Sequence, residues 1–131
     1  MRVSLDTNVL VRLVTEDDPA QARAARDHLE GKDIYVAKTV LLESEWVLRH
    51  AYDLARPKIA GVFRVVLGLE NLVAESAGEA RAALGWYERG LDFADALHLA
   101  SSGACDRLVT FDRSLAATAS RLELAAAVHL L

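Results

Sequence analysis

Residues 2–8, Arg2-Val3-Ser4-Leu5-Asp6-Thr7-Asn8, predict a short strand that stops at residue types favoured at the start of a helix. A matching run near the other end, 107–111, also stops at an aspartate, Asp112. Further strands are predicted at 33–37, 71–74 and 127–131, and helical patterns separate them. This alternation predicts an α/β fold, a parallel central sheet flanked by helices.

The helices are predicted wherever apolar residues recur three or four positions apart between those strands. The expected helical ranges are 9–14, 19–30, 40–54, 57–69, 78–89 and a helix that opens at Asp92. Thr39 is expected to cap the third helix. Gly31 and Gly90 are expected to end the second and the fifth.

Composition limits the kind of protein this is. A chain of 131 residues that is 53% hydrophobic and 26% charged predicts one domain over residues 1–131. The single cysteine, Cys105, cannot form an intrachain disulfide, and the first residues lack the apolar run of a signal peptide, so a cytoplasmic location is expected. No apolar stretch is long enough for a membrane span.

The formal net charge of −4 argues against nucleic-acid binding through bulk electrostatics. Contacts to phosphates would therefore have to be local. The arginines nearest in sequence to the acidic motifs are Arg12, Arg49, Arg56 and Arg113.

Acidic residues stand where the predicted fold would gather them. Asp6 and Asp112 directly follow strands, and ligand sites of open parallel sheets lie beyond the carboxyl ends of the strands. Glu43 is expected on the apolar face of its helix, where a carboxylate is costly unless a positive charge compensates it. Asp92 and Asp95 are three residues apart at a helix start, so both can project toward one point, with Asp95 the deeper.

Each of these acids also has an ordinary structural explanation. Asp6, Asp92 and Asp112 all stand where a helix N-cap is expected. Glu43 has the alternative of a half-exposed position beside a surface ion pair of Glu45 and Arg49, which are four residues apart. Taken together, however, four acids at strand ends and on an apolar helix face favour a functional site.

Carboxylates gathered in one cleft repel each other, and hard cations such as Mg²⁺ or Mn²⁺ relieve that repulsion. Two such ions about 4 Å apart activate a water and stabilise the leaving oxygen of a phosphodiester, which predicts hydrolysis that leaves a 5′-phosphate. Thr7, Asn8 and Thr110 are candidates for orienting the acids. His98 is expected to be a packed core residue and is left out of the site.

Four segments resemble PIN-domain ribonucleases: Val3–Asn8, Leu42–Leu48, Asp92–Ala96 and Leu108–Asp112. Their order and spacing match along nearly the whole chain. A domain of this length further resembles the VapC-type toxins of type II toxin–antitoxin pairs.

The resemblance implies an Mg²⁺- or Mn²⁺-dependent endoribonuclease that acts on RNA, forms a homodimer and is covered by a cognate antitoxin. Carried over residue by residue, it makes Asp6 and Asp95 the principal metal ligands, Glu43 the third acid and Asp112 the fourth. Asp92 is an accessory ligand candidate. The predicted helices 40–54 and 57–69 are candidates for the antitoxin or dimer surface, although their apolar faces would equally complete the core.

Two other functions are compatible with the motifs. One is a non-catalytic binding module of the same fold that holds a basic partner peptide in its acidic pocket. The other is a phosphoacceptor domain that uses Asp6 or Asp112. The second is disfavoured because none of the three lysines, Lys32, Lys38 and Lys58, follows a late strand.

Overall fold

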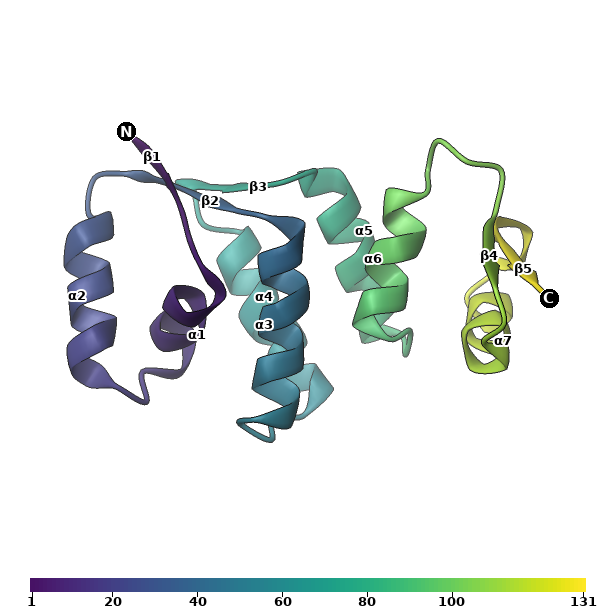
Figure 1. The fold of residues 1–131 in the computed structure, drawn as a ribbon, viewed down its shortest axis with the longest axis horizontal. Coiled ribbons are helices and arrows are strands. Elements are labelled where there is room, and N and C mark those ends of the chain that lie inside the picture. Colours follow the sequence, from purple (N-terminus) through teal and green to yellow (C-terminus); the bar gives the residue numbers. More distant parts are fainter. The chain divides into compact units, whose positions relative to one another are not determined.

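Every strand pairing in the computed structural model is parallel, and helices connect the paired strands (Figure 1). The structure describes all residues, 1–131. The chain forms two units, Met1–Ala77 and Gly78–Leu131. The predicted α/β class, with parallel strands flanked by helices, is confirmed.

The first unit contains a three-stranded sheet in the order β1-β2-β3. Its elements are β1 (Arg2–Ser4), α1 (Thr7–Thr15), α2 (Pro19–Leu29), β2 (Asp33–Val36), α3 (Lys38–His50), α4 (Arg56–Leu67) and β3 (Leu72–Ala74). Val3 pairs with Ile34, which in turn pairs with Leu72. Parallel neighbours need crossovers, and each crossover here holds two helices. The carboxyl ends of all three strands therefore share one edge, where α1 and α3 begin.

Helix packing holds this unit together. Helix α1 packs against α2 and α3, and α4 packs against α3 and β3. The buried side chains include Leu10 and Val11 of α1, Leu41 and Leu48 of α3, and Ile59 of α4. Because burial of one such side chain contributes about 2 kcal/mol, the helices stabilise the unit more than its three- and four-residue strands do.

The second unit contains a two-stranded parallel sheet in which Leu108 pairs with Val128. Its elements are α5 (Ala77–Glu88), α6 (Phe93–Ser101), β4 (Leu108–Thr110), α7 (Arg113–Arg121), the 3₁₀ turn η1 (Ala125–Ala127) and β5 (Val128–Leu130). Helix α7 lies in the crossover from β4 to β5. Tyr87 of α5 packs edge-on against Phe93 at the start of α6, with ring centroids 5.2 Å apart.

Element boundaries show where the sequence-based expectations were right and wrong. Gly31 and Gly90 have positive φ angles of 73° and 113° just past the ends of α2 and α5, as expected of glycines that end helices. The cap predicted at Thr39 is wrong, because the N-cap of α3 is Ala37 and Thr39 lies inside the helix. Helix α3 also ends at His50, earlier than predicted.

Helix α7 is the one α-helix for which the sequence predicted no range. Its sequence, RSLAATASR, contains one large apolar residue, Leu115, which is buried together with Ala119. A helix that buries so little lacks the repeated apolar pattern by which helices are predicted. None of the helices combines the length and the apolar character needed to cross a membrane.

Candidate functional site

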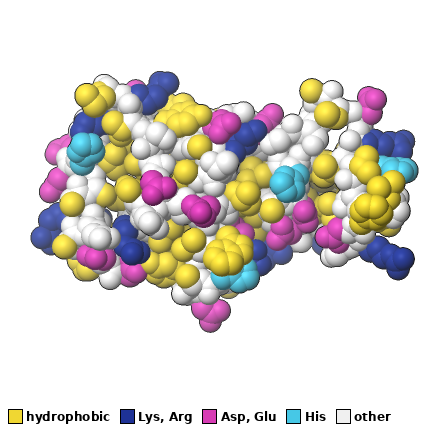
Figure 2. All heavy atoms as spheres, viewed as in Figure 1, with side chains coloured by type: hydrophobic (Ala, Val, Ile, Leu, Met, Phe, Trp, Pro, Cys, Tyr) yellow, Lys and Arg dark blue, Asp and Glu magenta, His cyan; other side chains and the backbone are white.

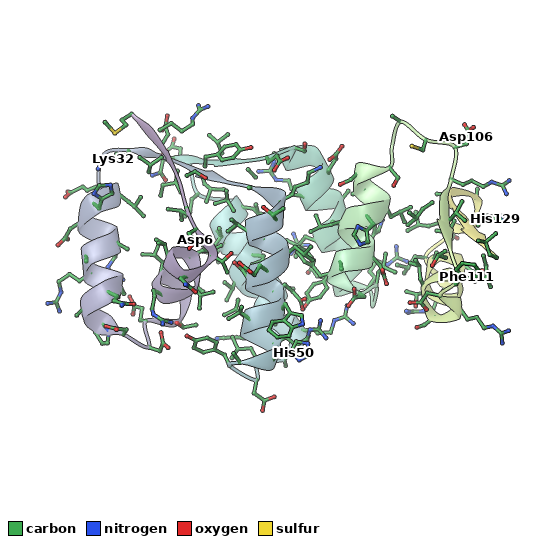
Figure 3. All side chains as sticks on the ribbon, viewed as in Figure 1. Asp6, Lys32, His50, Asp106, Phe111 and His129 are labelled. Atoms are coloured by element: carbon green, nitrogen blue, oxygen red, sulfur yellow. The ribbon has the colours of Figure 1, made fainter.

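Asp6 connects β1 to α1 at the carboxyl edge of the first sheet (Figure 3). It occupies the N-cap of α1, and its backbone oxygen accepts hydrogen bonds from the N–H groups of Val9 and Leu10 at 3.1 and 3.2 Å. Its exposed side chain makes no capping hydrogen bond. An aspartate at this position normally caps with its carboxylate. The carboxylate of Asp6 is therefore left available to bind something other than its own helix.

Glu43 lies on α3, but on the opposite face from the one predicted. The buried positions of this helix are Leu41, Ser44, Glu45 and Leu48, whereas Glu43 is exposed. The expectation that Glu43 lies on the apolar face is therefore wrong. Since α3 begins at the carboxyl end of β2 and packs against α1, topology still brings Glu43 and Asp6 to the same side of the first sheet.

Glu45 is the carboxylate that this helix buries. Its side chain is 2% exposed and receives two hydrogen bonds from Arg49, Nε to Oε2 at 2.8 Å and Nη2 to Oε1 at 3.3 Å. The pair predicted between Glu45 and Arg49 is confirmed, but it is not a surface pair. The positive charge that a buried carboxylate requires is supplied here by the protein itself.

Asp92 and Asp95 occupy the start of α6 in the second unit. Asp92 is the N-cap, and its Oδ2 accepts a hydrogen bond from the backbone N–H of Asp95 at 3.3 Å. Asp95 follows in the first turn and is the less exposed of the two, as predicted. The N-terminal turn of the helix thus holds both carboxylates close together.

The Asp95 carboxylate has an unusual environment. Burial raises the pKa of Asp95 above its usual value, the negative charges of Asp92 and Asp112 raise it further, and His98 lowers it. No hydrogen bond contributes to this shift. Asp95 is therefore a partly buried acid without a hydrogen-bond donor, near two other acids of its own unit.

Asp112 is held by the helix that it starts. Its Oδ1 accepts hydrogen bonds from the backbone N–H groups of Ser114 and Leu115 at 2.8 and 3.1 Å. The Oγ1 of Thr110 accepts a hydrogen bond from the backbone N–H of Asp112 at 2.9 Å, so Thr110 contacts the main chain of Asp112, and its role as a donor that orients the acids stays a prediction. Asp112 is thus a cap whose negative charge also acts on Asp95.

His98 interacts with Asp95, although the sequence pattern predicted no role for it in the site. It lies one turn after Asp95, it is exposed, and its interaction with Asp95 lowers the pKa of that carboxyl. The expectation of a packed core histidine is therefore wrong. Its spacing of three residues from Asp95 on a helix was the available signal.

Two of the arginines nearest in sequence to the acidic motifs are engaged with other side chains. Arg12 donates to Asp17, Gln21 and Tyr52, and Arg49 is paired with Glu45. Thr7 is buried at the start of α1. Arg12 and Arg49, two of the arginines nearest in sequence to the acidic motifs, are therefore already paired with other side chains of the protein.

The structure groups the predicted acids by unit: Asp6 and Glu43 in the first, and Asp92, Asp95 and Asp112 in the second. Neither unit by itself gathers three or more His, Cys, Asp or Glu side chains in an arrangement ready to hold a metal ion. The chemistry of these side chains nevertheless fits Mg²⁺ or Mn²⁺, because all five are carboxylates and Asp95 lies near two other acids and accepts no hydrogen bond.

Comparison with known proteins gives one match. The family model described as PIN domain matches residues 3–121, a range that includes Asp6, Glu43, Asp95 and Asp112. No curated protein and no solved structure matches the chain. PIN domains are generally nucleases, which supports a hydrolase activity on nucleic acid. Since the match extends over most of the sequence and through both units, the chain belongs to the PIN domain family.

Proposed function

We propose that this protein is a metal-dependent endoribonuclease and the toxin of a type II toxin–antitoxin pair. The observation that carries the nuclease proposal is the partly buried Asp95 carboxylate, which has no hydrogen-bond donor and lies near Asp92 and Asp112. Such an arrangement destabilises the protein unless a cation compensates it. The PIN family match supports a phosphodiester as the substrate.

In this proposal residues 1–131 act as one PIN-like domain, with Asp6, Glu43, Asp95 and Asp112 as the catalytic acids. The same four residues and Asp92 are the metal ligands. Bound Mg²⁺ or Mn²⁺ would supply an activated water and charge stabilisation for phosphodiester hydrolysis. Asp112 is fixed in place by the N-terminus of α7, and its own Oδ2 remains for a ligand.

The proposal includes competition between a metal ion and a proton for the Asp95 carboxylate. Because its pKa is raised, Asp95 holds a proton to higher pH than an ordinary aspartate does. A cation favours the ionised form, so binding should displace that proton and pull the carboxylate pKa down. Metal binding should therefore weaken as the pH is lowered toward the range in which Asp95 is protonated.

The toxin assignment rests on the resemblance of a domain of this length to the VapC-type toxins within the PIN family. It includes a cognate antitoxin that covers the acids, a homodimer and action in the cytoplasm. Growth inhibition on induced expression, relieved by coexpression of the neighbouring upstream gene, would support it. Unimpaired growth at high expression of active protein would contradict it.

The nuclease proposal is tested with purified protein and a single-stranded RNA. We expect cleavage with Mn²⁺ or Mg²⁺ that stops with a chelator and leaves 5′-phosphate ends. Asp6→Asn and Asp95→Asn should each abolish it, and Asp27→Asn, an exposed acid on α2, is the matched control. Absence of cleavage, together with calorimetry that detects no Mn²⁺ binding, would contradict the proposal and favour the binding module for a basic peptide.

A further inference from the structure

The exposed side of α3 carries residues that the catalytic proposal does not explain. Four positions of this helix are exposed: Thr39, Glu43, Trp46 and His50. Their spacing of four, three and four residues places them in one stripe along the helix. This stripe lies opposite the buried Leu41, Ser44, Glu45 and Leu48. Glu43 therefore shares a continuous surface with two aromatic rings.

The two rings contact each other at the surface. The ring centroids of Trp46 and His50 are 4.7 Å apart, with an angle of 40° between the ring planes. Trp46 is 56% exposed, although a tryptophan usually buries most of its surface. Figure 3 labels His50 at the C-terminal end of α3, and Figure 2 shows a hydrophobic side chain beside a histidine there. The indole thus presents aromatic surface to solvent.

The position of these rings relative to Glu43 suggests what covers them. An α-helix rises 1.5 Å per residue, so Trp46 lies about 4.5 Å and His50 about 10 Å farther along the axis than Glu43. Both rings are therefore close enough to contact a nucleotide next to one whose phosphate lies at Glu43. Proteins that bind single-stranded RNA stack unpaired bases on tryptophan and histidine rings.

Charge also favours a stacking contact. The chain carries a formal net charge of −4, and the guanidinium groups of Arg12 and Arg49 are engaged with Asp17 and Glu45. Attraction to phosphates alone is therefore weak for this protein. Base stacking needs no positive charge, because every base has an aromatic face.

We propose that Trp46 and His50 form a stacking platform for an unpaired nucleobase beside the scissile phosphate of the RNA substrate. This proposal rests on the proposed nuclease function. An RNA base is favoured over a protein partner because the exposed apolar surface of the stripe is limited to adjacent rings and continues into the acidic Glu43. Protein docking surfaces are larger contiguous apolar patches.

The test compares Trp46→Ala, Trp46→Phe and the wild type, with Val65→Ala as the control for an exposed apolar residue on α4 of the same unit. Binding is measured with a fluorescent single-stranded RNA in Ca²⁺, and KM and kcat for cleavage are measured in Mn²⁺. We expect Trp46→Ala to raise Kd and KM about 5- to 100-fold, as loss of one stacked base does. Trp46→Phe and Val65→Ala should stay near the wild type, and His50→Ala should weaken binding less than Trp46→Ala.

A second oligonucleotide that keeps every phosphate but has abasic sites separates stacking from other contacts. The wild type should bind the abasic strand as weakly as Trp46→Ala binds the intact RNA. If Trp46→Ala lost as much affinity for the abasic strand as for the intact RNA, the proposal would be overturned. The proposal would also be overturned if Trp46→Ala bound RNA with the same Kd as the wild type. This holds even if the substitution disrupted a protein complex. If the wild type itself neither binds nor cleaves RNA, the proposed nuclease function is wrong as well. If the wild type cleaves RNA but the Trp46 results are as just described, only the stacking proposal is wrong.

Discussion

Two aspartates that precede helices in this chain use their oxygens differently. The carboxylate of Asp112 accepts two backbone hydrogen bonds from α7, whereas that of Asp6 caps nothing. A capping hydrogen bond contributes about 1 kcal/mol of stability. Residue type and position were enough to predict both as N-cap residues. Only the structure shows that Asp6 leaves its carboxylate uncommitted, since side-chain direction is not encoded in residue type.

Two substitutions of Asp112 separate capping from catalysis. Asparagine caps as well as aspartate does, so Asp112→Asn should change the melting temperature by less than about 1 °C, while Asp112→Ala should lose about 1 kcal/mol. Both remove the carboxylate charge. Because loss of a residue that merely supports a metal ligand costs 10- to 100-fold, we expect cleavage to fall about 100-fold in both variants. An Asp112→Asn protein with wild-type cleavage would show that the residue is a structural cap alone.

The raised pKa of Asp95 predicts how the stability of the protein depends on pH. Its folded pKa is raised above the usual 3.8, so the folded state binds the proton more tightly than the unfolded chain does. The resulting loss of stability is absent below pH 3.8 and complete above the folded pKa. Asp95→Asn should therefore raise the melting temperature at pH 7, but only slightly because the side chain is partly solvated.

The measurement is thermal unfolding in a chelator at pH 7 and at pH 3, with Asp106→Asn as the exposed control from the same unit. The gain from Asp95→Asn should be present at pH 7 and vanish at pH 3. A variant that is less stable than the wild type at pH 7 would mean that the carboxylate is better compensated than its contacts indicate.

At the scale of the element, α3 shows why a correctly predicted helix can have its faces assigned wrongly. Its apolar residues Val40, Leu41, Leu42, Val47 and Leu48 lie within an arc of about 220° around the helix, and Glu43 lies outside that arc. The helical angles of the apolar residues therefore place Glu43 on the polar side, a signal that the expectation for Glu43 missed. Tertiary packing selects the stripe that contains Glu45, and Glu43 is left exposed. Helix α7 illustrates the opposite limit, because it buries too few large side chains to be predicted.

Glu43 and Glu45 offer a matched pair of substitutions on that helix. Glu45→Ala removes a buried ion pair, so it should destabilise the protein by about 3 kcal/mol. Glu43→Ala removes an exposed carboxylate and should change stability by less than about 0.5 kcal/mol. In the proposed function Glu43→Ala nevertheless lowers cleavage about 100-fold.

Chemical denaturation and cleavage rates measured on both variants give the comparison. Equal destabilisation by the two substitutions would contradict the burial pattern of α3. Full activity in Glu43→Ala would remove Glu43 from the proposed catalytic acids without affecting the structural assignment of Glu45.

At the scale of the whole molecule, the alternation of strands and helices was the most predictable feature. Parallel pairing follows from it, because each strand is separated from the next by a helical crossover. The order of acidic motifs along that alternation was sufficient to suggest the family that the comparison then found. Sequence order did not predict how the carboxylates would interact, because that depends on side-chain geometry within each unit.

Metal binding should be visible in the stability of the whole protein. A ligand that binds the folded state alone stabilises it by RT ln(1 + [L]/Kd), or about 2.7 kcal/mol at 100 times Kd. For a chain of this length that corresponds to a rise of roughly 10 °C in melting temperature. We expect Mn²⁺ to produce such a rise at pH 7, and a smaller one at pH 4, where protons compete for Asp95. Asp6→Asn and Asp95→Asn should each reduce the rise, while Asp27→Asn should keep it. A rise of equal size in Asp95→Asn would place the bound ion elsewhere and remove the principal support for the catalytic assignment.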